Sequence, residues 1–304
     1  MVPKILGLEQ IEPLLEPDGL RAVMAEVLME LSAGRAAAPA RIAAHSAEGL
    51  LAAMPGQAAG VLGAKLVTVF PGNAAKGLPG HQALVALFDA GDGLPLALLE
   101  GTAITTARTA AVSAVAADAL ARRDAGVLAI IGTGVQAEGH WRAVGRVRNF
   151  REVRVAGRTP AKVAARAAAW GAVASANVEE AVKGADVVCC CTHAAEPVLR
   201  REWLAPGAHV NSVGIGGCEL DAATIAGGRL VVESAVAFAP FPGGAYELQG
   251  LDAAMGVELG AVLAGNARGR TSADEITVFK SIGHAVEDVA AAAWVLRRHA
   301  AAAT

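Results

Sequence analysis

The sequence predicts an α/β protein built on a doubly wound parallel sheet, and three observations support this prediction. From residue 127 onward, apolar runs of strand length alternate with stretches of helical character. The first run, 127–131, leads directly into the pattern Gly132-x-Gly134-x-x-Ala137 and then into a helix-compatible stretch. Before residue 127 the strand-like segments follow one another closely, which predicts an α+β unit with an antiparallel sheet.

The individual elements follow from local patterns. In the first ~30 residues, apolar side chains three to four positions apart predict a helix around residues 20–28. Alternation predicts strands over 61–70 and 82–88, and Gly91-Asp-Gly93 predicts a hairpin between 82–90 and 94–100. A helix is expected over 159–169, with Thr159 as N-cap, and another over 283–301. The predicted strands of the parallel sheet are 127–131, 152–156, 186–191, 208–213 and 229–232.

Composition limits the classes of function. A net charge of −3 gives no argument for nucleic-acid or membrane-surface binding, and no apolar run approaches the ~18–20 residues of a membrane span. Residues 1–20 carry four acids and do not resemble a signal peptide. Three of the four cysteines are consecutive (189–191) in an apolar run without metal-ligand spacing. They predict small core residues, no metal site, a reducing compartment and a cytoplasmic location.

The glycine pattern after the first strand predicts nucleotide binding. Gly132 permits a tight turn, Gly134 lets the backbone approach a pyrophosphate, and Ala137 is small enough for the helix to pack on the strand. The following helix then presents unpaired N–H groups and the positive end of its dipole to the phosphates.

The end of the second strand bears on the choice of cofactor. An acid there would bind the ribose 2′-hydroxyl of NAD, but the chain has Arg158 and Thr159, with Lys162 nearby. A guanidinium matches phosphate oxygens, so NADP(H) is favoured and NAD(H) remains possible. Thr192 and His193 follow the third strand, and 211–214, which includes Val213, end the fourth. The residues at both strand ends are candidate contacts to the nicotinamide half of the cofactor.

Three basic residues upstream predict a second site. Lys65 lies inside an apolar strand, where a lysine is costly to bury, so it should face a cleft or an anion. Arg108 is placed at the start of an apolar helix, and Arg41 precedes a short apolar segment. Two arginines and a lysine are suited to bind a substrate carboxylate beside an amine that carries a proton. The alternative interpretation is that both arginines are ordinary exposed charges.

From about Arg41 to Leu296 the chain resembles the ornithine cyclodeaminase/μ-crystallin family of NAD(P)-dependent imine-handling enzymes. The segments that carry the resemblance are Gly63-Ala-Lys-Leu-Val, Gly80-His-Gln-Ala, Glu100-Gly-Thr-Ala-Ile-Thr-Thr-Ala-Arg-Thr-Ala-Ala, Ile131-Gly-Thr-Gly-Val-Gln-Ala, Gly157-Arg-Thr, Pro206-Gly-Ala-His-Val-Asn and Thr277-Val-Phe-Lys-Ser-Ile-Gly-His-Ala-Val-Glu-Asp.

The resemblance implies a homodimer whose chain has two domains. A Rossmann-like NAD(P)-binding domain would cover 113–282, and a discontinuous α+β substrate and dimerisation domain would cover 1–112 and 283–304. By motif, Arg41 and Arg108 resemble the substrate-carboxylate clamp and Lys65 the catalytic lysine, with His81 and Gln82 lining the same cleft. The implied pyrophosphate contacts are Thr109, Gly132, Thr133, Gly134, Val135, Gln136 and Ala137.

One departure from the family bears on the reaction. Cyclodeaminases resemble one another in an acidic loop after the Asn-x-Val-Gly turn, whereas here Val213-Gly-Ile-Gly-Gly-Cys218 carries no acid and is about three residues shorter. Glu219 and Asp221 instead match a Glu-Leu-Asp expected to cap the next helix. This favours reduction of a small cyclic ketimine, such as Δ1-pyrroline-2-carboxylate or Δ1-piperideine-2-carboxylate, to an L-imino acid. Ornithine cyclodeamination, alanine-dehydrogenase-like reductive amination of a small 2-oxo acid and a non-catalytic cofactor-binding role remain alternatives.

Overall fold

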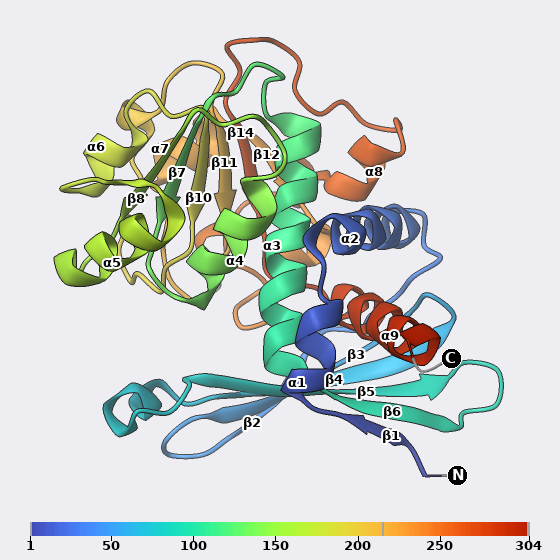
Figure 1. Cartoon of the computed structure of the whole chain (residues 1–304). Coiled ribbons are helices and arrows are strands. Elements are labelled where there is room, and N and C mark those ends of the chain that lie inside the picture. The colour runs from blue at the N-terminus through green and yellow to red at the C-terminus, as the bar shows by residue number, and fades with distance from the viewer. Residues whose placement is uncertain (1, 215, 303–304) are drawn as a thin grey trace. The chain divides into compact units, whose positions relative to one another are not determined.

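The computed structural model describes residues 2–214 and 216–302 and divides the chain into two compact units (Figure 1). Unit 1 comprises residues 1–108 and 284–304, and unit 2 comprises residues 109–283. The predicted division differs slightly, because residues 109–112 and 283 belong to unit 2. Helix α3 (Gly101–Leu120) runs through the first boundary without a break, so no local signal in the sequence marks the change of unit.

Unit 1 contains a six-stranded sheet in the order β1-β6-β5-β4-β3-β2. The hairpin expected around Gly91-Asp-Gly93 is confirmed, since β5 and β6 pair antiparallel. The sheet is nevertheless mixed rather than purely antiparallel, because the N-terminal strand β1 pairs parallel to β6. The strands are β1 (Lys4–Leu6), β2 (Ile42–His45), β3 (Leu50–Ala58), β4 (Val61–Val69), β5 (His81–Asp89) and β6 (Pro95–Glu100).

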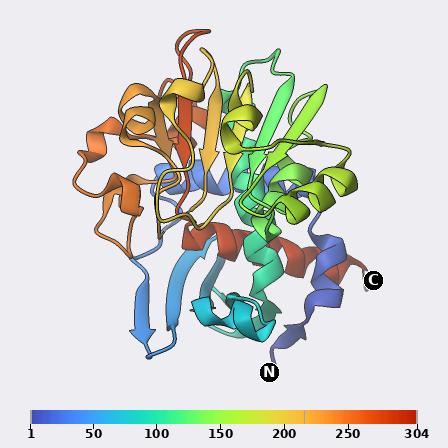
Figure 2. The same ribbon diagram turned by 90° about the vertical axis from the view of Figure 1, so that its left-hand side faces the viewer.

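One face of this sheet is covered by the last helix, α9 (Ala285–Ala302). Figure 2 shows α9 in red beside the blue strands, and it contacts β3, β4 and β5 as well as α2 (Pro17–Ser32). The approach is close, because a Cβ on Gly63 of β4 would lie 2.9 Å from Val289 Cγ2 of α9. A short helix, α1 (Leu8–Ile11), also contacts α9. The missing side chain of Gly63 therefore lets the helix approach the strands.

Unit 2 contains an eight-stranded parallel sheet in the order β13-β12-β14-β11-β10-β7-β8-β9. The chain starts at β7, runs outward to β9 and then returns to β10 on the other side of β7, so the doubly wound prediction is confirmed. The strands are β7 (Val127–Ile131), β8 (Glu152–Ala156), β9 (Val173–Ala174), β10 (Val187–Cys190), β11 (His209–Ser212), β12 (Arg229–Val232), β13 (Val257–Glu258) and β14 (Thr277–Lys280).

In the described part of unit 2, five α-helices lie entirely within the unit: α4 (Val135–Val144), α5 (Pro160–Trp170), α6 (Val178–Val182), α7 (Ala222–Gly227) and α8 (Leu259–Leu263). Helix α5 begins after Thr159 as predicted, although the Thr159 hydroxyl makes no capping hydrogen bond. Within the described ranges, no helix is both long enough and apolar enough to cross a membrane.

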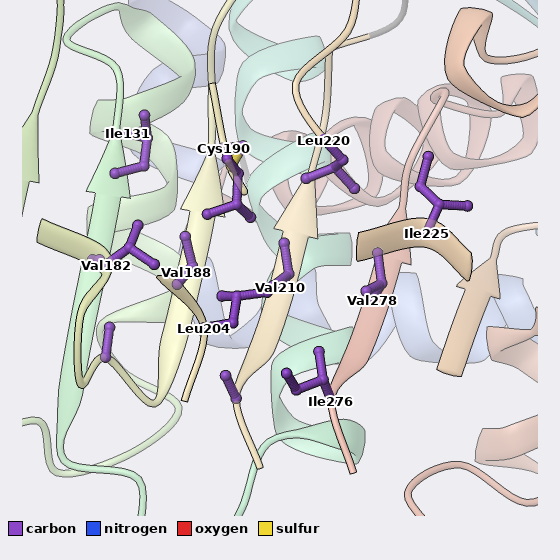
Figure 3. Packing of buried hydrophobic residues seen from close by; sticks show 14 of the residues in the cluster. Ile131, Val182, Val188, Cys190, Leu204, Val210, Leu220, Ile225, Ile276 and Val278 are labelled. Carbon is purple, nitrogen blue, oxygen red and sulfur yellow. The ribbon is translucent and has the colours of Figure 1, made fainter. Parts of the chain in front are cut away.

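Alternate side chains of the parallel strands enter two apolar clusters. Figure 3 shows one of them, in which Val188 and Cys190 of β10 pack with Val210 of β11 and Val278 of β14. Cys189 and Cys191 belong to the other cluster. The predicted core role of the three consecutive cysteines is thus confirmed, and burial raises the pKa of the Cys189 thiol to about 12. Residues 2–214 and 216–302 contain no group of three or more side chains suited to hold a metal ion.

Candidate functional site

Four charged side chains form a buried cluster in unit 1. Lys65 Nζ lies 2.7 Å from Asp288 Oδ2, and Arg108 Nε lies 2.8 Å from Asp288 Oδ1. Arg108 Nη1 also lies 2.6 Å from Glu287 Oε2. Asp288 therefore bridges a lysine and an arginine, and all four residues are almost completely excluded from solvent. We call these four residues the unit 1 charge cluster.

These four side chains come from β4, α3 and α9. The alternation of β4 turns Lys65, like Gly63, toward the face covered by α9. Glu287 and Asp288 lie in the first turn of α9, where the positive end of the helix dipole favours acids. Glu287 Oε2 also accepts a hydrogen bond from the backbone N–H of His284 at 3.2 Å. Arg108 lies within α3 and not at the helix start predicted from the sequence.

The proton affinity of Lys65 is set by opposing effects. Burial lowers the pKa of Lys65 to about 8. That value already includes two smaller, opposing effects: the Asp288 carboxylate raises the pKa of Lys65, and the positive charges of Arg108 and Arg41 lower it. Burial would also raise the pKa of Asp288, but the two cations outweigh it and hold that pKa below its ordinary value. Desolvation, more than neighbouring positive charge, thus makes Lys65 able to exchange a proton near neutral pH.

The other residues predicted around Lys65 fall into two groups. Arg41 is half-buried, precedes β2, and acts on Lys65 electrostatically. His81 and Gln82 are exposed at the start of β5, opposite Val69 and Thr68 of β4. Neighbouring residues of a strand point to opposite faces, so His81 shares the face of Lys65 and Gln82 does not. The prediction that both line one cleft therefore has different support for the two residues, since only His81 lies on the face of Lys65.

The acids Glu287 and Asp288 were not predicted as site residues. The available signal was a pair of acids within an otherwise apolar segment, 285–295, which is buried apart from Trp294. Buried carboxylates require partners, so such a pair indicates cations nearby.

In unit 2 the glycine loop has the geometry that its sequence predicts. Gly132 has a φ of 129°, and a Cβ there would lie 2.5 Å from the carbonyl oxygen of Cys191, so only glycine fits. A Cβ on Gly134, the N-cap of α4, would meet no atom within 4 Å, which leaves room above the backbone. Ala137 is fully buried. The loop and the first turn of α4, with Thr133, Val135 and Gln136, therefore fit a pyrophosphate.

The remaining predicted cofactor residues lie at the ends of strands or in α3. Arg158 and Thr159 follow β8 and are exposed, which leaves both accessible to a ribose phosphate. Thr109 is buried in α3, directly after Arg108. Thr192 follows β10 and Val213 follows β11, and the backbone N–H groups of both donate to the Glu219 carboxylate. Of the two acids expected to cap α7, only Asp221 does so, with its Oδ1 2.8 Å from Thr224 N.

Comparisons with known proteins agree with this geometry. The chain is 40% identical over 251 residues to the ketimine reductase mu-crystallin of Mus musculus, covering 80% of this chain and 79% of that protein. It matches the structure of Δ1-pyrroline-2-carboxylate reductase from Thermococcus litoralis in complex with NADH and L-proline, with a TM-score of 0.90, 31% identity, and coverage of 99% and 98%. An archaeal alanine dehydrogenase dimer with bound NAD gives a TM-score of 0.88 and 31% identity, with coverage of 100% and 98%.

The resemblance seen in the sequence motifs thus extends over the whole length of the chain. Residues 1–303 match the ornithine cyclodeaminase/mu-crystallin family, and the chain belongs to that family.

Proposed function

We propose that this protein is an NAD(P)H-dependent reductase of small cyclic ketimines such as Δ1-pyrroline-2-carboxylate or Δ1-piperideine-2-carboxylate. The observation that carries the proposal is the buried Lys65, whose pKa of about 8 and ion pair with Asp288 suit a proton donor. The mouse relative is a ketimine reductase, and the Thermococcus litoralis relative is a Δ1-pyrroline-2-carboxylate reductase.

The reaction adds a hydride and a proton across the C=N bond. The reduced nicotinamide, when bound, supplies the hydride to the imine carbon. The Lys65 ammonium gives its proton to the imine nitrogen and becomes a neutral amine, which solvent reprotonates. Arg108 is oriented for the substrate carboxylate by Glu287 and Asp288, which hold its Nη1 and Nε donors and so fix the plane of the guanidinium.

The charge of the site supports a substrate with one carboxylate. Arg108 is buried and Arg41 is half-buried, and the positive charges of both act on Lys65. A guanidinium forms strong, charge-assisted hydrogen bonds with a carboxylate. The single carboxylate of a cyclic 2-imino acid is therefore a suitable group for these arginines.

The loop after β11 favours reduction over cyclodeamination. Residues 213–218 contain no acid that would act on a substrate amino group. The acids that follow are both engaged, since Glu219 accepts five hydrogen bonds and Asp221 caps α7. An alanine-dehydrogenase-like reaction can be distinguished from ketimine reduction by assay, because only the former depends on added ammonia.

The direct test is oxidation of NADPH or NADH by the purified protein with Δ1-pyrroline-2-carboxylate, followed at 340 nm. We expect rapid oxidation without added ammonia, and a loss of about 10²- to 10⁴-fold in Lys65→Met, because general acid catalysis contributes that much. Ammonia release from ornithine without net oxidation of the cofactor would instead identify a cyclodeaminase. Unchanged turnover in Lys65→Met would remove the role given to Lys65.

The pH dependence tests the partnership of Lys65 with Asp288. Reduction needs protonated Lys65, so kcat/KM should be constant at low pH and fall as the pH rises through about 8. Asp288→Asn removes the charge that raises the pKa of Lys65, and the fall should therefore move to lower pH. Glu287→Gln is the matched control, because the ion pair of Glu287 in the unit 1 charge cluster is with Arg108, and its fall should stay near 8. An Asp288→Asn profile that coincides with wild type would contradict the assignment.

We further propose NADP(H) as the preferred cofactor, although the solved relatives contain NADH and NAD. Support comes from Arg158 and Thr159, which are exposed where an NAD-binding chain places an acid. Arg158→Ala should raise KM for NADPH about 10- to 100-fold, the value of one or two charged hydrogen bonds, and leave KM for NADH unchanged. Equal effects on the two cofactors would contradict the preference.

We also propose a homodimer formed through the outer face of the unit 1 sheet. The face opposite α9 exposes large apolar side chains, in which Leu62 faces Phe88 and Leu66 faces Leu84 across β4 and β5. Such a patch marks an interface, and the archaeal relative is a dimer. Sedimentation should give twice the chain mass of 30.5 kDa. Leu66→Lys should dissociate the dimer and Leu78→Lys, at an exposed site outside the sheet, should not. A monomeric wild type would rule out this proposal.

A further inference from the structure

The carboxyl ends of β10 and β11 are joined by a buried acid that the proposed reaction does not use. Glu219 is 1% exposed and accepts five hydrogen bonds from two loops. Its Oε1 accepts from Thr192 N at 2.5 Å and Thr192 Oγ1 at 2.8 Å. Its Oε2 accepts from Ser212 Oγ at 2.7 Å, Val213 N at 3.0 Å and Gly214 N at 2.8 Å. One carboxylate thus fixes the backbone that follows both strands.

A second buried ion pair, between Lys280 and Glu247, contacts the backbone of Glu219 and its neighbours. Lys280, the last residue of β14, lies 2.9 Å from Ser212 Oγ and forms an ion pair with Glu247. It also donates to the carbonyl oxygen of Gly214. Glu247 in turn accepts from the backbone N–H groups of Glu219 and Leu220. These contacts link Ser212 through Lys280 and Glu247 to the backbone of Glu219. The Glu219 carboxylate is therefore held at both its side chain and its backbone.

The donors around Glu219 require a carboxylate. Three of its five partners are backbone N–H groups, which can donate and never accept. A glutamine would place an amide NH₂ against at least one of them and would leave two donors facing each other. Glu219 therefore cannot be replaced by its neutral isostere without moving at least one of the two loops.

The sheet order indicates which part of a dinucleotide these loops face. The strand order reverses between β7 and β10, and a dinucleotide lies across such a switch point at the carboxyl ends of the strands. The adenosine ribose belongs to the β8 side, where Arg158 lies, so the nicotinamide half belongs to the β10 and β11 side. Thr192 and Val213, which Glu219 holds, lie on that side.

We propose that Glu219 is a positioning residue for the nicotinamide half of the cofactor, acting through the loops at Thr192 and Val213. The proposal rests on the proposed function only in that the cofactor is a nicotinamide dinucleotide. The proposal predicts different effects on two ligands: loss of Glu219 should weaken binding of the intact cofactor and leave binding of its adenosine half unchanged.

The test compares the cofactor with ADP-ribose, which lacks the nicotinamide ring. Dissociation constants are measured by calorimetry for NADPH or NADH, whichever wild type binds more tightly, and for ADP-ribose with the matching 2′ group. Glu219→Gln should raise the Kd of the reduced cofactor at least about tenfold and leave that of ADP-ribose within about twofold. Asp221→Asn is the matched control two residues away: it weakens the cap of α7, so it should lower the thermal midpoint and leave both constants unchanged.

If Glu219→Gln does not fold, Ser212→Ala gives the same test, because it removes one of the five donors and the link to Lys280. It should raise the Kd of the reduced cofactor severalfold and spare ADP-ribose. Equal weakening of both ligands, or no weakening of either, would overturn the proposal. Wild-type protein that binds neither NADPH nor NADH would instead overturn the proposed function.

Discussion

The Asp288 carboxylate, which joins Lys65 to Arg108 inside unit 1, is the constraint on which this unit depends. Removing one partner of a buried ion pair leaves an uncompensated charge and costs about 3–5 kcal/mol. The three residues come from β4, α3 and α9, which are far apart in the sequence. The cluster therefore forms only after the last helix has packed on the sheet, and the small residue Gly63 permits that close packing.

The sequence indicated one half of this cluster and missed the other for a physical reason. A lysine within an apolar strand is costly to bury, so Lys65 could be recognised without knowledge of its partners. Glu287 and Asp288 lie in the first turn of a helix, where acids are common simply because of the helix dipole. Only the pairing of α9 with β4 distinguishes these two acids from ordinary first-turn acids, and that pairing is not local.

The same contrast holds in unit 2. Strands β7 and β8 have the predicted bounds. β7 is an apolar run and β8 alternates charged with apolar residues, and a glycine, Gly132 or Gly157, follows each strand. Strand β14 was not predicted, because its four residues include Lys280, whose buried charge has its partners, Glu247, Ser212 and Gly214, elsewhere in the chain. Glu219 was expected to be a helix cap, since Glu-Leu-Asp fits that local pattern. Its five donors come from Thr192, after β10, and from residues 212–214 at the end of β11, and no spacing in the sequence brings them together.

The buried acids Asp288 and Glu219 have different partners, and this difference bears on the reaction. Asp288 faces cations, so it holds charge near a proton that Lys65 can release. The described partners of the Glu219 side chain are hydroxyl and backbone N–H groups, so its carboxylate shapes the loops without being in a position to take a proton from a substrate. An enzyme that deaminates needs an acid or base beside the substrate amino group, and the loop after β11 commits its nearest acid to structure. The proposed reduction needs no such group there, because the hydride would come from the cofactor and the proton from Lys65. This division of labour is the physical reason to favour the reductase.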